Sequence, residues 1–173
     1  MEKFVYTIGH STRELNDFLE LLNINSIKTL VDVRAFPGSR RYPQYNKDEL
    51  STRLEKIGIT YIHMPELGGR RKASPKSENT AWKNEAFKAY ADYMNTPEFK
   101  HAIDKLAMQA ADRTTAYMCS EAVWWRCHRR LISDWFVANG WNVLHIMSKT
   151  KNDMHKLQEE AVVLNGRILY PGR

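Results

Sequence analysis

Short apolar runs alternate along the chain with segments whose apolar residues recur at helical spacing. The runs are rich in β-branched and aromatic side chains and predict strands at residues 3–8, 29–33, 59–63, 114–119 and 141–147. Strands that alternate with helices in this way form a mainly parallel sheet flanked by helices on both faces. We therefore predict an α/β fold, a single three-layer domain over residues 1–173, with its site at the carboxyl ends of the strands.

The helices are predicted from apolar stripes and from the residues that begin or end them. Ser11 and Glu14 form a capping box before the first stripe, and Gly140 follows the last turn of the stripe that begins at Leu131. Other stripes predict helices after residue 46, over about 80–94, from residue 97 and, more weakly, over 153–163. No internal repeat or low-complexity linker divides the chain.

The densest group of reactive side chains follows the predicted strand that ends at Cys119. Glu121, His128 and Arg129 come within one loop and one helical turn of this thiol. Ligands of open α/β sheets bind beside such loops, and groups of this kind are costly to assemble without a use. The cluster therefore predicts a functional site.

Two other strand ends carry polar side chains. His10 and Ser11 follow the first strand, where amides at a helix start can hold an anion. Asp32 and Arg34 follow the second strand. They form either a structural ion pair or an acid beside an anion-binding arginine, and we favour the second reading.

Two irregular segments mix basic residues with aromatic residues or glycines. Residues 35–46 include Arg40 and Tyr45, a combination that suits phosphate contacts and base stacking. A long loop contains Gly68 and Gly69, which allow unusual backbone angles before Arg70. We expect this loop to be a basic flap over an anionic substrate.

The composition of the chain indicates which classes of partner the protein binds. The net charge is +6 and the isoelectric point is about 9.3, which favours an anionic ligand, nucleic acid or nucleotide. No apolar run approaches the ~20 residues of a membrane helix, so no membrane partner is expected. Two cysteines and a strand-like start, in place of a signal peptide, predict a cytoplasmic protein. The oligomeric state stays open.

Four chemistries fit these residues. The first is a phosphatase or sulfurtransferase loop with Cys119 as nucleophile, although Arg126 lies one residue beyond the usual spacer. A zinc site is the second, but the spacing of Cys119, Cys127 and His128 matches no familiar finger, so we predict no metal and no cofactor. The third uses Glu121 and Asp32 as acid, base or electrostatic groups. The fourth is nucleic-acid binding without catalysis.

Several motifs are similar to those of a known family, the domain-of-unknown-function family number 488. The resemblance covers nearly the whole chain and is carried by Thr7-Ile8-Gly9-His10-Ser11, Val31-Asp32-Val33-Arg34 with Pro37, Ser39-Arg40 and Pro43, Glu66-Leu67-Gly68-Gly69-Arg70, Cys119-Ser120-Glu121, Cys127-His128-Arg129 and His145-Ile146. It implies an α/β domain and marks these positions as pocket residues, without an activity. Two tryptophans in the segment 122–126 depart from the pattern, so we expect a different pocket shape.

Together these observations predict an enzyme that acts on nucleic acid or nucleotides. We expect a hydrolase that cleaves a glycosidic bond to a modified base, as DNA glycosylases do. The alternatives are a Cys119-dependent phosphatase or sulfurtransferase and a non-catalytic nucleic-acid-binding module. The expected catalytic residues are Glu121, Asp32, His10, Cys119 and His128. The expected substrate- and phosphate-binding residues are Ser11, Arg34, Arg40, Tyr45, Gly68, Gly69, Arg70 and Arg129.

Overall fold

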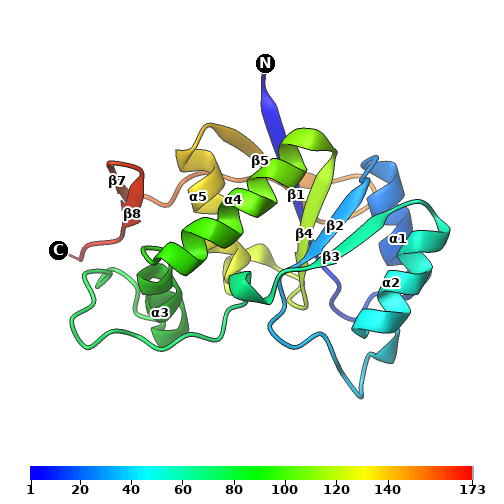
Figure 1. Cartoon of the computed structure of the whole chain (residues 1–173), viewed down its shortest axis with the longest axis horizontal. Coiled ribbons are helices and arrows are strands. Elements are labelled where there is room, and N and C mark those ends of the chain that lie inside the picture. The colour runs from blue at the N-terminus through cyan, green and yellow to red at the C-terminus, as the bar shows by residue number, and fades with distance from the viewer. Residues whose placement is uncertain (173) are drawn as a thin grey trace.

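A six-stranded sheet forms the centre of the computed structural model, which describes residues 1–172 (Figure 1). The strand order is β3-β2-β4-β1-β5-β6. The first five strands run parallel, and β6 is antiparallel to β5 at one edge. The bounds are β1 (Lys3–Gly9), β2 (Thr29–Asp32), β3 (Thr60–His63), β4 (Thr115–Cys119), β5 (Trp141–Ile146) and β6 (Asn152–Met154). This confirms the predicted α/β fold with a mainly parallel sheet.

Helices cover both faces of the sheet (Figure 1). On one face, Phe18 and Leu54 of α1 and α2 pack with Leu30 of the sheet. On the other, Leu106 and Phe136 of α4 and α5 pack with Tyr117, and α3 joins the same core. The bounds are α1 (Leu15–Ile24), α2 (Lys47–Lys56), α3 (Glu85–Tyr93), α4 (Pro97–Asp112) and α5 (Arg129–Ala138). A small hairpin of β7 (Val162–Leu164) and β8 (Arg167–Leu169) lies outside the main sheet.

Strand register brings the polar loops together. Gly9 at the end of β1 is paired with Cys119 at the end of β4, and Asp32 at the end of β2 is paired with Met118. The segments that follow these three strands therefore leave the sheet at one edge, side by side. Sequence positions more than a hundred residues apart meet there because parallel strands share their carboxyl ends.

Three local predictions were wrong. The segment 153–163 contains no helix. Its first residues belong to β6, which pairs with β5, and the His155 side chain that follows is buried. Ser11 makes no capping box, since it has a φ of 49° and α1 begins only at Leu15. The helix expected from residue 80 begins at Glu85, where the Asn84 side chain accepts hydrogen bonds from two backbone amides.

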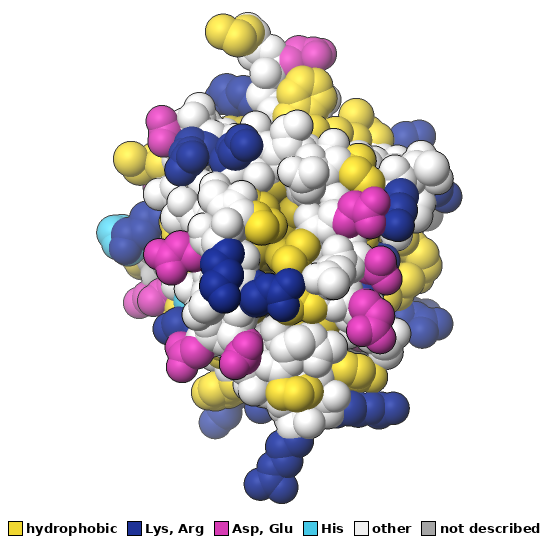
Figure 2. All heavy atoms as spheres, turned by 90° about the vertical axis from the view of Figure 1, so that its right-hand side faces the viewer, with side chains coloured by type: hydrophobic (Ala, Val, Ile, Leu, Met, Phe, Trp, Pro, Cys, Tyr) yellow, Lys and Arg dark blue, Asp and Glu magenta, His cyan; other side chains and the backbone are white. Residues whose placement is uncertain are grey.

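Charged side chains on the face over α1 and α2 are of both signs. Figure 2 shows Lys and Arg interspersed with Asp and Glu around a small apolar patch. The net positive charge is therefore not concentrated on this face. Within residues 1–172, every helix is too short or too polar to cross a bilayer.

The core on the α4 face offers a matched stability test. Leu106 is fully buried, whereas Met108 on the same helix is 72% exposed. Leu106→Ala should lower the free energy of unfolding by about 2–5 kcal/mol, because it leaves a cavity in a packed layer. Met108→Ala should change it by less than about 0.5 kcal/mol. Urea denaturation followed by circular dichroism measures both, and equal effects would refute the layer assignment.

Candidate functional site

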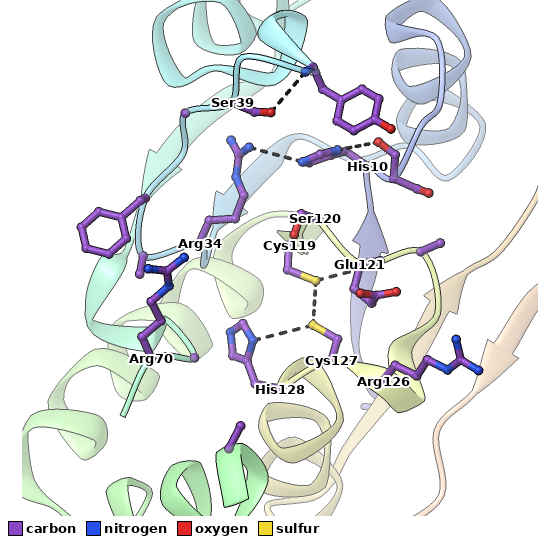
Figure 3. Close-up of a pocket in the computed structure, with 18 of the residues that line it drawn as sticks. His10, Arg34, Ser39, Arg70, Cys119, Ser120, Glu121, Arg126, Cys127 and His128 are labelled. Carbon is purple, nitrogen blue, oxygen red and sulfur yellow. Dashed lines mark hydrogen bonds between the residues drawn. The ribbon is translucent and has the colours of Figure 1, made fainter. Parts of the chain in front are cut away.

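A pocket of about 630 Å³ opens at the carboxyl ends of β1, β2 and β4 (Figure 3). Its walls come from the loops after these strands, from the loop at Gly69, from the start of α3 and from the residues that lead into α5. Eight of the predicted site residues line it: His10, Ser11, Arg34, Gly69, Arg70, Cys119, Glu121 and His128. The pocket is thus assembled from segments that are distant in sequence and adjacent in space.

Two cysteines meet at the inner wall of this pocket. The sulfur atoms of Cys119 and Cys127 lie 2.7 Å apart, and both side chains are buried (Figure 3). Cys119 is the last residue of β4, and Cys127 precedes α5 in extended backbone, which turns its sulfur toward the sheet. In the sequence, Cys127 was considered as a zinc ligand and, through the family motif, as a pocket residue. Its contact with Cys119 in the reduced protein depends on a turn that periodicity does not predict.

Arg129 lies directly behind the two sulfurs and is only 1% exposed. Its Nε donates to Cys119 Sγ at 3.0 Å, one terminal nitrogen donates to Thr7 Oγ1 at 3.0 Å, and the other donates to the Glu121 carbonyl at 2.7 Å. No carboxylate among residues 1–172 forms an ion pair with this guanidinium. A buried charge without a counter-ion is strongly unfavourable. The sulfur pair is therefore the only direct source of compensating charge within the described chain.

The pair accordingly carries one negative charge. Burial opposes ionisation of Cys127, but the hydrogen bond from Cys119 and the charge of Arg129 outweigh it and lower the pKa of Cys127 to about 6. Burial and the contact with Cys127 raise the pKa of Cys119 well above its ordinary value. The Arg129 amide, at the start of α5, also donates to Cys127 Sγ. These shifts favour the thiolate form at Cys127, with the Cys119 thiol in contact with it.

His128 stands beside the thiolate. Its Nδ1 lies 3.7 Å from Cys127 Sγ, so these neighbours do not point apart as a helical spacing implies. Burial lowers the pKa of His128, which keeps the ring neutral. Its buried Nε2 has no hydrogen-bond partner within residues 1–172. A neutral imidazole in this place can exchange a proton with a group bound near the sulfur.

Arg34 is fixed by Asp32, which lies under the pocket and does not line it. The Asp32 carboxylate binds Nε and one terminal nitrogen of Arg34, at 2.9 and 2.7 Å, and accepts a further hydrogen bond from Tyr61. The other terminal nitrogen of Arg34 lies 3.4 Å from His10 Nε2, in the pocket wall (Figure 3). Asp32 thus fixes the orientation of the Arg34 guanidinium in the pocket wall.

His10 is held in one tautomer. Its Nδ1 donates to the Ser11 carbonyl at 2.9 Å, which leaves Nε2 as an acceptor toward Arg34. Burial, the largest influence, and the nearby Arg34 charge lower the pKa of His10 to about 4. Tyr45 is fully buried and stacks on His10 with centroids 4.2 Å apart. Tyr45 therefore supports the pocket wall and does not face the pocket.

The mouth of the pocket combines cations with an aromatic ring. Arg70 and Arg126 are exposed there, and Glu121 is the sole carboxylate in the lining. Phe36 is 71% exposed, with the Arg70 guanidinium 5.2 Å from its ring centre. The entrance thus presents positive charge beside a free aromatic face.

Two glycines are required by close approach. A Cβ on Gly9 would lie 1.7 Å from the Glu121 carbonyl oxygen, and one on Gly69 would lie 2.9 Å from His128 Nδ1. The backbone angles of Gly68, φ −65° and ψ 155°, are open to any residue, so the expectation of unusual angles at this position was wrong. Glycine lets the loop pack against Ala35 and His128.

The remaining predicted residues lie outside the lining. Asp32, Tyr45, Gly68 and Arg129 support it from behind. Arg40 is exposed on the lining loop, between Ser39 and Tyr42, but does not line the pocket itself.

Cys127 was marked as a pocket position only through the family motif. Arg126, Phe36, Tyr42 and Phe87 were not predicted to line the pocket. No cluster of three or more potential metal ligands occurs within residues 1–172.

One comparison with known proteins gives a match. The family model described as "Domain of unknown function DUF488" matches residues 14–136. Neither the curated proteins nor the solved structures include a match to this chain.

The lowered pKa of Cys127 predicts a pH-dependent reactivity. Alkylation by iodoacetamide should rise with pH through a midpoint near 6, because the thiolate is the reactive form. In the urea-denatured chain the midpoint should return to about 8.5. Since the folded pKa is the lower one, this ionisation stabilises the fold fully above the unfolded pKa. That stability is lost as pH falls toward 6.

The modified residue should be Cys127, identified by peptide mass spectrometry. A folded-state midpoint at or above that of the denatured chain would mean that the pair holds no stabilised thiolate.

Proposed function

The chain belongs to the DUF488 family, and from the geometry of its site we propose that it is a thiolate-dependent enzyme acting on a phosphate-bearing, nucleotide-like substrate. Cys127 is the proposed nucleophile. It attacks an electrophilic atom of the substrate and displaces a leaving group, which departs with the electron pair of the broken bond, so that a covalent intermediate forms. Water or a second substrate then attacks the same atom, loses its proton and releases the Cys127 thiolate. The neutral His128 is the proposed proton carrier at the sulfur.

The observation that carries this proposal is the buried guanidinium of Arg129. It contacts a sulfur, a hydroxyl and a carbonyl, but no carboxylate of the described chain. Such an arrangement favours a thiolate over a neutral thiol at the pocket wall. A purely structural cysteine pair needs no buried cation behind it, and a helix residue at this position could be apolar at lower cost.

The lining supports an anionic substrate that carries an aromatic ring. Arg34 is held rigidly by Asp32, while Arg70 and Arg126 stand at the mouth. These guanidiniums suit phosphate oxygens. The exposed ring of Phe36 offers a stacking surface for a base. A mononucleotide, or the end of a nucleic-acid strand, satisfies both requirements within a pocket of about 630 Å³.

The loop after Cys119 argues against a phosphatase-type anion cradle. In such a cradle, backbone amides face the sulfur. Here the Glu121 carbonyl oxygen lies 3.9 Å from Cys119 Sγ and is bonded by Arg129. We therefore assign substrate binding to the side-chain guanidiniums and nucleophilic attack to Cys127 in place of Cys119.

Hydrolysis of a glycosidic bond is the second candidate, favoured by the exposed carboxylate of Glu121 in the pocket. The geometry supports it less well, because Asp32 is buried and bonded to Arg34 and Tyr61. Glu121 is then left without the second carboxylate on which the common glycosidase mechanisms depend.

Two exposed arginines test substrate binding. Arg70→Ala should weaken binding of fluorescent mononucleotides about tenfold or more, because it removes a charge-assisted phosphate contact at the mouth. Arg40 lies between Ser39 and Tyr42 but is itself outside the lining, so Arg40→Ala should change affinity less than about twofold and serves as the matched control. Fluorescence anisotropy measures both. Equal losses would indicate a diffuse charge effect in place of a site.

Two substitutions separate the candidate chemistries. A panel of mononucleotides and short oligonucleotides with altered bases is screened for turnover by liquid chromatography and mass spectrometry. For any substrate found, Cys127→Ser should reduce turnover by at least about a thousandfold, while Glu121→Gln retains most of it.

The reverse pattern would establish the glycosidic-bond mechanism and refute the thiolate mechanism. Binding without turnover across the whole panel would favour the non-catalytic binding module.

A further inference from the structure

A continuous chain of hydrogen-bonded, buried side chains connects Arg129 to Asp134 by way of residues of the neighbouring strands. Thr7 Oγ1 accepts from Arg129 at 3.0 Å and lies 2.6 Å from His145 Nδ1. His145 Nε2 lies 2.9 Å from His155 Nδ1, and His155 Nε2 lies 2.7 Å from Asp134 Oδ1. All five side chains are buried, and none of them lines the pocket. The reaction proposed above uses none of the four beyond Arg129 directly.

Regular elements hold the members in place. Thr7 of β1 and His145 of β5 are direct partners in the parallel register. Asp134 and Arg129 both belong to α5, and His155 follows β6, where its amide bonds the Val143 carbonyl. The hydrogen-bonded side chains therefore begin and end on α5 and connect this helix to the strands beside it.

The hydrogen bonds have one direction. Asp134, as a carboxylate, can only accept, and it also receives the Tyr170 hydroxyl at 2.8 Å and the Gln158 amide. His155 therefore donates from Nε2 to Asp134, and with a single ring proton it accepts at Nδ1 from Nε2 of the neutral His145, which in turn accepts at Nδ1. The Thr7 hydroxyl donates to His145, so its lone pairs remain for Arg129.

His145 stays neutral within this chain. Burial, then the charges of His155 and Arg129, lower the pKa of His145 to about 2. The ring of Trp124 stacks on His145 with centroids 4.5 Å apart and planes 6° from parallel. His145 is thus a neutral, buried group between His155, which contacts the Asp134 carboxylate, and Thr7, which contacts the Arg129 guanidinium.

We infer that Thr7, His145 and His155 are positioning residues that aim the Arg129 guanidinium at the cysteine pair. The hydrogen bond that Arg129 donates to Thr7 Oγ1 holds the guanidinium in one orientation. In this orientation its Nε donates to Cys119 Sγ, and its charge stabilises the thiolate. This inference rests on the proposed function and deepens it, because it names residues behind the pocket that set the reactivity of the nucleophile.

The test compares two buried threonines of the same sheet. Thr7→Val keeps the side-chain shape, removes the link to Arg129, and should raise the alkylation midpoint of Cys127 by roughly one pH unit. Thr115→Val is the matched control, because Thr115 is also fully buried and bonds only the Arg113 carbonyl. It should leave the midpoint where it is in the unmodified protein. Thr7→Ser should restore it, since the hydroxyl is retained.

The outcomes separate the two proposals. The other charged or titratable groups around the sulfurs, His128, Tyr90 and Tyr117, are the same in every variant. A low midpoint that Thr7→Val leaves unchanged would overturn the positioning role while the thiolate stands. An ordinary midpoint already in the unmodified protein would overturn the proposed function itself. A shift as large in Thr115→Val would reduce the effect to general destabilisation.

The direction of the hydrogen bonds between Asp134 and Thr7 can be measured directly in the unmodified protein. Nitrogen-15 NMR of the unmodified protein near pH 7 should show His145 and His155 protonated at Nε2 and unprotonated at Nδ1. A proton on Nδ1 of either ring would reverse the hydrogen bonds and refute the inference, even where Thr7→Val fails to fold.

Discussion

The buried guanidinium of Arg129 is the constraint on which the site depends. It sits at the first residue of α5, in contact with β4, with β1 and with the loop after Cys119, and is almost wholly excluded from solvent. A cation in that place is tolerable only if each of its nitrogens finds an acceptor and a negative charge lies close by. Cys119 Sγ, the Thr7 hydroxyl and the Glu121 carbonyl accept from the three nitrogens, and the sulfur pair supplies the negative charge. Fold, ionisation and reactivity are coupled through this one side chain.

The same logic orders the rest of the pocket. Two groups that face the cavity are held by buried groups that do not: Asp32 holds Arg34, and Tyr45 stacks on His10. The convergence of β1, β2 and β4 at one edge supplies the framework for this arrangement. Binding groups that are fixed in advance lose little freedom when a ligand arrives. A rigid inner wall and an exposed mouth at Phe36 and Arg70 are consistent with recognition of a small anion that carries a ring.

Sequence reasoning reached the strands and their polar ends, because apolar periodicity and strand-end chemistry are local signals. The sequence did not predict how deeply each of these side chains is buried. Asp32 and Glu121 look alike in the sequence, yet one is buried under Arg34 and the other lies exposed in the lining, a difference set by tertiary packing. The last segment was misread because its short strand is stabilised by pairing with β5. The partnership of Cys119 with Cys127 was missed for the same reason: it depends on where a loop returns.

Of the two tryptophans after Glu121, which were expected to shape the pocket, one packs against buried histidines instead. Both tryptophans depart from the family pattern as it reads in sequence, and were expected to reshape the pocket. Neither one lines it. Trp124 instead turns inward and stacks on His145, while its edge meets His155. A large flat ring against these two imidazoles keeps water from competing for their hydrogen bonds, which a fixed chain of hydrogen bonds requires. The loop that supplies Glu121 and Cys127 to the pocket therefore also seals the polar chain behind it.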